Sequence, residues 1–434
     1  MPSSDATTAA AQAALPTRHT LHAPAAVLDR FTDSELASLI TLRRTLHANP
    51  ELSNVEHATA DRLHTALRAL GVTEVQRVAG TGVMARIPGR THGAPVVALR
   101  GDIDALPIQE QTGLPFASQV PGVMHACGHD VHASWIVGAA MELLREPAAG
   151  DVLLILQPAE EIGAGARAII DSGVLHGVAA IFGGHVDRRF LVGQVIAEPG
   201  PLAASADSFT IILTGRGAHG ARPHEAADPI VAAAAVIAAV QTIVSRRIDP
   251  SRPAVCTIGS IHAGVAANVI PDTATMTGTL RATDAQTRAL LTTELARIAR
   301  EVAAAHGVEA VVTIERGTPP IVNPVREAAW ARQAATAMLG ADAVVPFGIT
   351  NMGGEDFAFY MEQVPGCFLR VGARAPGEPP TAAHSPRFDV AEGAILVGAV
   401  VLAACARTAS QSLATGRGVD DAEPSSGSSN RPML

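Results

Sequence analysis

Apolar residues along the chain follow two different periods, and their alternation predicts a mixed α/β protein. Helical spacing of apolar residues, three and four positions apart, covers about 33–47 and 56–70. Short β-branched runs follow at 83–87, 96–99, 152–156 and 178–182, and helical patterns lie between several of them, notably at 131–145 and 164–172. Strands that alternate with helices are typical of an α/β sandwich around a central, mostly parallel sheet flanked by helices.

Two stretches rich in Pro and Gly, at 199–201 and 317–320, divide this pattern. Between them the chain reads strand, long helix, two strands, helix and strand, at 208–213, 228–246, 254–261, 273–281, 285–306 and 308–314. This order predicts a smaller α+β unit of βαββαβ type, inserted into the larger domain. We therefore expect a catalytic domain made of residues 31–198 and 318–407, and an inserted domain made of residues 199–317.

Both ends of the chain differ in composition from the rest. Residues 1–30 are rich in Ala, Ser and Thr, and lack the basic start and unbroken apolar core of a secretory signal, so they predict a flexible tail. Residues 408–434 end in Ser, Gly, Asn and Pro and predict a disordered tail. The most apolar stretches, 230–244 and 395–406, are shorter than the roughly 20 residues that span a bilayer, so we expect buried helices and no membrane partner.

Composition narrows the class of protein further. The chain has 434 residues, of which 48% are hydrophobic, enough for two soluble globular domains. A net charge of −9 without any basic block makes nucleic acid an improbable partner. All 32 basic residues are Arg, which excludes chemistry based on a Schiff-base lysine or a phosphate-loop lysine. Four widely spaced cysteines do not form a secreted disulfide framework and favour a reducing cytoplasm.

Polar residues of one chemical kind gather at the ends of the predicted strands. Cys127 and His129 lie just before a predicted helix, and the adjacent Glu160 and Glu161 end an apolar strand. A lone Cys or His is usually structural, but a cluster of thiolate, imidazole and carboxylate groups is what a divalent metal and the water it activates require. Because the carboxyl ends of parallel strands meet at one edge, we expect His185, His384 and the orienting carboxylate of Asp104 to join them.

A long series of motifs extends this interpretation. In order they are LHANPELS (46–53), RGDIDALPIQE (100–110), MHACGHDVH (124–132), QPAEE (157–161), GGHV (183–186), GAHGARPHEAADPI (217–230), NVIPD (268–272), GTLRATD (278–284), GGEDFAFY (353–360) and AHSPRFD (383–389). With these motifs, residues 40–400 resemble the two-metal aminoacylase and carboxypeptidase family, in its branch of hippurate hydrolases and auxin-conjugate amidohydrolases.

The resemblance implies a role for individual positions. It implies that two divalent ions, Zn²⁺, Mn²⁺, Co²⁺ or Ni²⁺, are held by Cys127, His129, Glu161, His185 and His384. Glu160 resembles the family's general base and acid. His219 matches a histidine that reaches the partner subunit's site and stabilises the oxyanion, and Asn268 matches a position near the substrate carboxylate. The inserted domain would then be both a lid and the interface of a homodimer or higher homo-oligomer.

One segment departs from the family pattern. The stretch Asp187 to Phe190 replaces a more usual Trp- and Pro-containing segment, so Arg188 and Arg189 either favour an anionic substrate or are simply solvated. An aromatic content of 3% leaves little stacking surface for an aryl group. His125, His132 and His224 lie inside motifs, where a structural role is expected.

The leading hypothesis is a cytoplasmic, metal-dependent amidohydrolase that cleaves N-acyl amino acids or related small amides with a metal-activated water. The same machinery would serve a dipeptidase, a carboxypeptidase or a hydrolytic deaminase acting on another C–N bond. A thiol enzyme would use Cys127 as the nucleophile with His129 or His132, but it has no need of paired glutamates. A non-enzymatic metal- or peptide-binding protein has little need of Glu160.

Overall fold

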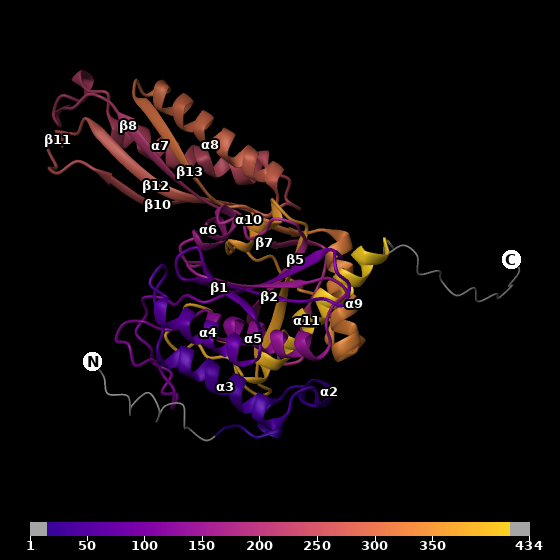
Figure 1. Ribbon diagram of the computed structural model, residues 1–434. Coiled ribbons are helices and arrows are strands. Elements are labelled where there is room, and N and C mark those ends of the chain that lie inside the picture. Colours follow the sequence, from indigo (N-terminus) through magenta and orange to yellow (C-terminus); the bar gives the residue numbers. More distant parts are fainter. Residues whose placement is uncertain (1–14, 417–434) are drawn as a thin grey trace, which may run out of the picture.

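A computed structural model describes residues 15–416 of the chain and shows a large α/β unit carrying a smaller, elongated unit (Figure 1). The large unit is built on a seven-stranded sheet of order β1-β2-β4-β3-β5-β15-β6. Its strands are β1 (Glu74–Val78), β2 (Gly82–Ile87), β3 (Val96–Asp102), β4 (Val152–Gln157), β5 (Val178–Leu191), β6 (Val195–Ile196) and β15 (Gly366–Arg374). The four inner strands β4, β3, β5 and β15 pair in parallel, and antiparallel strands flank them. The predicted fold class is confirmed.

Side chains of the inner strands alternate between two separate cores, one on each face of the sheet. Leu154 packs in one core, whereas its neighbours Leu153 and Ile155 pack in the other. The helices of the first face are α3 (Asp33–Ala48), α4 (His57–Ala69), α5 (His129–Arg145), α9 (Val325–Leu339) and α11 (Gly393–Thr415). The second face carries α6 (Gly165–Asp171) and α10 (Phe357–Met361). Short strands β7 (Gly200–Ala203) and β14 (Ile321–Asn323) pair beside this face, where the chain leaves and re-enters the large unit.

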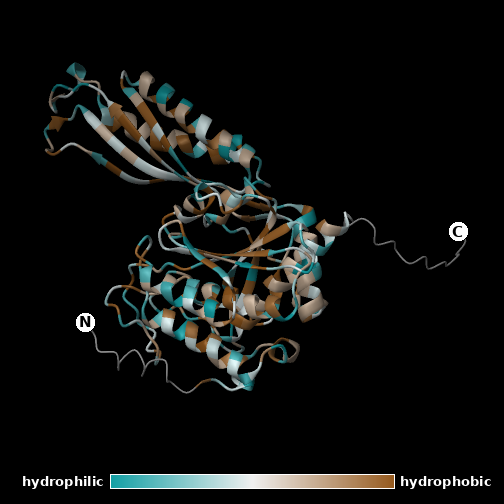
Figure 2. Cartoon of the chain, viewed as in Figure 1, coloured by the Kyte–Doolittle hydropathy of each residue, from teal (hydrophilic) through white to brown (hydrophobic). Residues whose placement is uncertain are grey.

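The exposure of each helix follows its sequence pattern. Thr32 caps α3 and accepts a hydrogen bond from the Glu35 N–H, while the Glu35 carboxylate accepts one from the Thr32 N–H, so the predicted start is well defined. α3 and α4 carry hydrophilic residues beside hydrophobic ones (Figure 2), because each has one side in solvent. α11 is apolar nearly throughout and lies in the core between α5 and α9.

The smaller unit has the predicted βαββαβ order. Its elements are β8 (Ala206–Thr214), α7 (Pro229–Thr242), β10 (Ala254–Ala263), β12 (Thr273–Ala282), α8 (Ala285–Ala305) and β13 (Glu309–Thr318). The strands form an antiparallel sheet of order β10-β12-β8-β13. Buried Ile211 and Leu213 face α7 and α8, whereas Ser208 and Ile212 on the other face are exposed.

Helical structure extends further toward both ends of the chain than the sequence indicated. Residues Arg18–Leu21 form a 3-10 turn and α2 (Ala25–Leu28) follows it, with Leu21 and Val27 in the main core, so 15–30 are not a flexible tail. At the other end α11 continues to Thr415 and buries Ala409 and Ser410. At both ends, packing of apolar side chains into the core holds the segment in place. The remaining parts of the predicted tails, 1–14 and 417–434, lie outside the described residues.

Two helices are long and apolar enough to cross a membrane by composition alone, 229–247 and 393–415. In the second, 89% of the apolar window is buried, as expected of a core helix. In the first, only 33% is buried, and Ile230 and Val231 are 43% and 53% exposed. The expectation of a buried helix at 230–244 is therefore wrong for the outer side of α7.

Candidate active site

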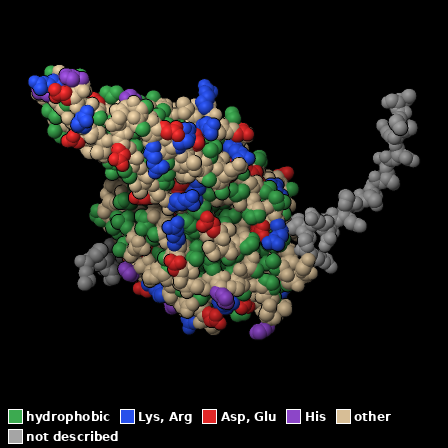
Figure 3. All heavy atoms as spheres, turned by 90° about the horizontal axis from the view of Figure 1, so that it is seen from above, with side chains coloured by type: hydrophobic (Ala, Val, Ile, Leu, Met, Phe, Trp, Pro, Cys, Tyr) green, Lys and Arg blue, Asp and Glu red, His purple; other side chains and the backbone are tan. Residues whose placement is uncertain are grey.

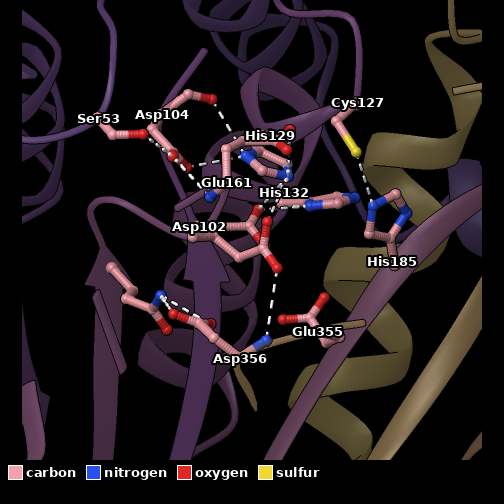
Figure 4. Close-up of polar contacts among 12 residues, drawn as sticks. Ser53, Asp102, Asp104, Cys127, His129, His132, Glu161, His185, Glu355 and Asp356 are labelled. Atoms are coloured by element: carbon pink, nitrogen blue, oxygen red, sulfur yellow. Dashed lines mark hydrogen bonds and ion pairs between the residues drawn. The ribbon is translucent and has the colours of Figure 1, made fainter. Parts of the chain in front are cut away.

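The predicted metal ligands converge where parallel strands of the large unit end. Asp102 ends β3 and Asp104 follows it, Glu160 and Glu161 follow β4, and His185 lies on β5. The loop before α5 supplies Cys127, and the first residue of that helix is His129. His384 enters from the segment between β15 and α11, and its backbone adopts a positive φ of 65°. Figure 4 shows this convergence around His129.

A sharp turn at Gly128 places two of these side chains side by side. Its φ of 99° is in the left-handed region, and an added Cβ would lie 2.4 Å from Val186 Cγ2. Only glycine therefore fits between Cys127 and His129. The turn brings Cys127 Sγ to 3.2 Å from His185 Nε2.

Asp104 contacts His129 through both its backbone and its carboxylate. His129 Nδ1 lies 3.0 Å from the Asp104 backbone oxygen and 3.0 Å from Oδ1, while Asp104 Oδ2 accepts hydrogen bonds from Ser53 Oγ and the Glu161 N–H. These bonds direct His129 Nε2 toward the adjacent glutamates, at 3.8 Å from Glu161 Oε1 and 3.9 Å from Glu160 Oε2. The arrangement is the usual one for a histidine that binds a metal through its other nitrogen.

The donor atoms fit a metal centre. Overlapping groups with all donors within 4.8 Å of one another are Cys127–His129–His185, Cys127–Glu161–His384 and His129–Glu160–Glu161. Together they contain all five predicted ligands and Glu160. His129 Nε2 and Glu161 Oε1 are buried without a hydrogen-bond partner among the described residues, an arrangement that a bound cation resolves. Sulfur, imidazole and carboxylate donors suit divalent transition metals.

Burial and mutual repulsion perturb the proton affinities of these groups. Burial, together with the charges of Glu355 and Asp356, raises the pKa of Glu160 well above its ordinary value. Burial also raises the pKa values of Glu161 and Cys127. The pKa of His185 falls because burial disfavours its charged form. Cations near these groups favour thiolate, carboxylate and neutral imidazole, the forms that bind metal.

Sequence reasoning assigned no role to a buried ionic network beneath the ligands. Arg100 donates to Asp102 at 2.5 Å, to Asp356 at 2.8 Å and to Gln157 at 2.8 Å. Asp102 Oδ1 also lies 2.6 Å from His132 Nδ1. This contact holds the His132 ring in place and engages its Nδ1. Burial and the neighbouring Glu355 raise the pKa of Asp356 to about 7. Both motifs, 100–110 and 353–360, were recognised in the sequence. Nothing in the sequence indicated that Arg100 of the first contacts Asp356 of the second.

The structure does not bring His219 and Asn268 to this cluster. Strand β9 (Ala218–His219) pairs with β11 (Val269–Ile270), and the Gly220 N–H donates to the Asn268 carbonyl at 2.7 Å. Both positions lie in the smaller unit near its far end, where Figure 1 labels β11. Neither lines the cavity above the ligands.

That cavity lies between the two units and has a volume of about 720 Å³. Glu160, Glu161 and the ligand side chains line it from the large unit, and Arg281, Arg316 and Thr318 line it from the smaller unit. Figure 3, seen from above relative to Figure 1, shows basic and acidic side chains interspersed with apolar ones on the upper face of the molecule. Arg188 and Arg189 do not line the cavity, because Arg188 pairs with Glu378 and Arg189 with Asp187.

The fold and the clustered donors define a metal-dependent hydrolase acting on C–N bonds of amides. The model of peptidase family M20/M25/M40 matches residues 98–408, and the chain belongs to that family. N-acetylcysteine deacetylase of Bacillus subtilis is 43% identical over 83% of this chain and 93% of its own. The IAA-amino acid hydrolase ILR1-like 4 of Arabidopsis thaliana is 39% identical over 85% of this chain and 84% of its own.

A solved structure agrees with the fold. The Bacillus subtilis YXEP protein, described as a dinuclear metal binding peptidase of the M20 family, superposes with a TM-score of 0.78 and 38% identity. The superposition covers 88% of this chain and 99% of that one. The fold of this chain is thus shared with a solved member of the family.

Proposed function

We propose that the protein hydrolyses the N-acyl bond of an amino acid or a similar small amide. The observation that carries the proposal is the position of Glu160. Its carboxylate lies within 4.8 Å of donor atoms of His129 and Glu161, and it lines the cavity of about 720 Å³. The names of the relatives, a deacetylase and an amino acid hydrolase, support the same substrate class.

The two ions would be held by Cys127, His129, Glu161, His185 and His384. When bound, they supply Lewis-acid chemistry, which polarises a carbonyl group and acidifies water. Asp104 keeps His129 in the tautomer that leaves Nε2 free to bind. The raised pKa of the buried Cys127 thiol argues against the alternative in which this thiol alone is the nucleophile.

Glu160 moves the proton. Its raised pKa, caused by burial and by the charges of Glu355 and Asp356, makes it a better proton acceptor than an ordinary glutamate. The Asp356 N–H lies 3.4 Å from Glu160 Oε1 and orients the carboxylate toward the cavity. We infer that Glu160 takes a proton from the attacking water and delivers it to the departing amine nitrogen.

His219 and Asn268 act in this proposal from a partner subunit of a homodimer. Both are remote from the ligands of their own chain, and the smaller unit that carries them extends away from the large unit. Exposed Ile230 and Val231 on α7 offer apolar surface for such an interface. His219 would stabilise the developing oxyanion and Asn268 would contact the substrate carboxylate, with the smaller unit closing as a lid.

The metal and the compartment follow from donor chemistry. Cys127 and the imidazoles favour Zn²⁺, Co²⁺ or Ni²⁺, whereas Glu161 also accepts Mn²⁺. The four cysteines are all free and buried in the described residues, which supports a cytoplasmic location. The same site would serve a dipeptide or another C–N bond, and the substrate panel below decides between them.

The test is hydrolysis of N-acyl amino acids, dipeptides and an aryl amide by chelator-stripped protein, with Zn²⁺, Mn²⁺ or Co²⁺ restored in turn. Glu160→Gln is expected to keep two ions per chain and to lose about 100- to 10,000-fold in kcat. Glu362→Gln, at an exposed position, serves as the matched control. Turnover that survives metal removal, or a fully active Glu160→Gln protein, would contradict the proposal.

A further inference from the structure

One buried cation at the site has no hydrogen-bond or ion-pair partner among the described residues, and its one ring contact is with Phe368, whose centroid lies 5.8 Å from the guanidinium carbon. Arg370 lies on β15 and its side chain is 8% exposed, yet it makes no hydrogen bond or ion pair with any residue that the structure describes. The acids around it are engaged elsewhere, because Asp187 is paired with Arg189 and Glu355 with Arg100. A buried charge without a counterion is costly, and arginine does not escape the cost by losing its proton.

Arg370 belongs to the wall of the metal cavity. It lies opposite His185 in the parallel pairing of β5 with β15, so the two side chains leave the same face of the sheet next to each other. It lines the same cavity as Cys127 and Glu160. The other arginines that line this cavity are more exposed, and Arg167 already stacks on the Phe359 ring at 4.1 Å.

We propose that Arg370 is a specificity-determining residue that binds a carboxylate on the acyl half of the substrate, so that the preferred substrates are N-acyl compounds with a dicarboxylic acyl group. A planar guanidinium on the cavity floor is suited to a carboxylate, which it binds through two parallel hydrogen bonds. The inference rests on the proposed function, in which the amine half and its carboxylate are directed to Asn268. Arg370, on the large unit, is then left for the acyl half.

The test compares two substrates of equal length, N-succinyl-L-methionine and N-butanoyl-L-methionine, which differ by one carboxylate on the acyl chain. The wild-type protein is expected to prefer the succinyl compound in kcat/KM. Arg370→Met is expected to lower that preference on the order of 10- to 100-fold while the butanoyl compound is affected far less. Arg370→Lys keeps the positive charge but loses the planar guanidinium group, so it is expected to retain part of the preference that Arg370→Met loses.

Arg167→Met is the matched control, since it removes an exposed arginine of the same cavity and is expected to leave the ratio unchanged. An unchanged ratio in Arg370→Met, with two ions still bound, would overturn the proposal. So would a preference that follows a carboxylate on the amino acid side chain, tested with N-butanoyl-L-glutamate and N-butanoyl-L-glutamine.

A binding measurement separates this inference from the proposed function. Calorimetry on metal-loaded Glu160→Gln protein compares succinamate with butanamide, and repeats the pair with Glu160→Gln/Arg370→Met. If wild type cleaves no N-acyl amino acid but only the first variant prefers succinamate, the proposed function fails and the carboxylate site stands. If both variants bind the two compounds equally, the Arg370 proposal fails even where turnover is found.

Discussion

At the scale of single residues, Asp104 connects three parts of the site. Its carboxylate contacts His129 Nδ1, Ser53 Oγ and the Glu161 N–H, so it orients one predicted ligand through its ring and a second through its backbone. Partners of this kind raise the basicity of the ligand and hold its geometry. We therefore propose that Asp104 acts on metal binding by orienting His129 and Glu161.

Asp104→Asn is expected to weaken metal binding by about 10- to 100-fold, because the amide presents only one acceptor oxygen where the carboxylate receives three contacts. Competition against a coloured chelator measures the affinity. Asp61→Asn, an exposed surface position, is the control, and Ser53→Ala, which removes a single donor, is expected to have a smaller effect. Equal affinities for wild type and Asp104→Asn would show that His129 needs no orienting carboxylate.

At the scale of elements, the packing of α11 against α5 holds the ligand-bearing helix in place. Gly398 of α11 meets Trp135 of α5 so closely that an added Cβ would lie 2.1 Å from Trp135 Cε3. Trp135 is fully buried and stacks on His132, which in turn contacts Asp102. The close contact of α11 with α5 at this glycine is thus connected, through the rings of Trp135 and His132, to the buried ionic network around Asp102.

Gly398→Ala is expected to lower the free energy of unfolding by about 1–3 kcal/mol, because the core has no room for the methyl group. Denaturant unfolding measures the change. Gly259→Ala is the control, since nothing lies within 4 Å of its added Cβ. A Gly398→Ala protein as stable as that control would mean that α11 shifts to accept the methyl group at no cost.

The elements also show what the sequence predicts well and what it does not. The ends of α3, β2 and β4 lie within a residue or two of their predicted positions, because capping and apolar periodicity are local signals. β5 was expected to end near 182 but continues to Leu191, since its second half pairs in parallel with β15, a contact between distant segments that no local pattern reveals. Residues 18–28 were expected to be a tail. They are buried by contacts with the distant α9 and α11, which no local pattern indicates.

The same reason limits prediction of the site. The five predicted ligands have side chains of metal-binding types that are visible in the sequence, and the structure brings them together. Arg100 and Asp356 are separated by most of the chain, so their contact required the fold. Arg370 lies in the middle of β15 among apolar neighbours, and nothing local indicates that it lines the cavity above the predicted ligands.

At the scale of the whole molecule, stability, pH and metal are linked. The folded state binds protons more tightly than the unfolded chain at Asp356, with a pKa of about 7, and at Glu160, Cys127 and His129, whose pKa values are also raised. For His129 burial alone would lower the pKa, and the charge of Asp102 reverses the direction. Stability of the metal-free protein contributed by these groups is lost as pH rises through their folded pKa values.

Above pH 7 the unfolded histidines are already neutral, and His129 and Glu160 are the groups that still hold protons in the folded state. We therefore expect the melting temperature of metal-free protein to fall as pH rises above 7, with a slope of about 1.4 kcal/mol per pH unit for each group that is protonated in the folded chain and deprotonated in the unfolded chain. Metal binding removes the His129 proton, so the stabilisation on adding Zn²⁺ should grow over the same interval. Thermal unfolding at fixed ionic strength measures both. A metal-free protein that becomes more stable toward pH 9 would contradict this linkage.

If the proposed dimer forms, each active site contains residues from two chains. If His219 acts in the partner's site, a chain with Glu160→Gln still donates an intact His219, and a chain with His219→Ala still provides an intact Glu160. Each protein alone should be nearly inactive, whereas subunit exchange between equal amounts should restore about a quarter of wild-type activity, since about half the dimers are mixed and each has one complete site. Activity after mixing and size-exclusion chromatography with light scattering measure the outcome. If mixing restores nothing although exchange is demonstrated by mass, His219 does not act across the interface, and the remote position of β9 has another explanation.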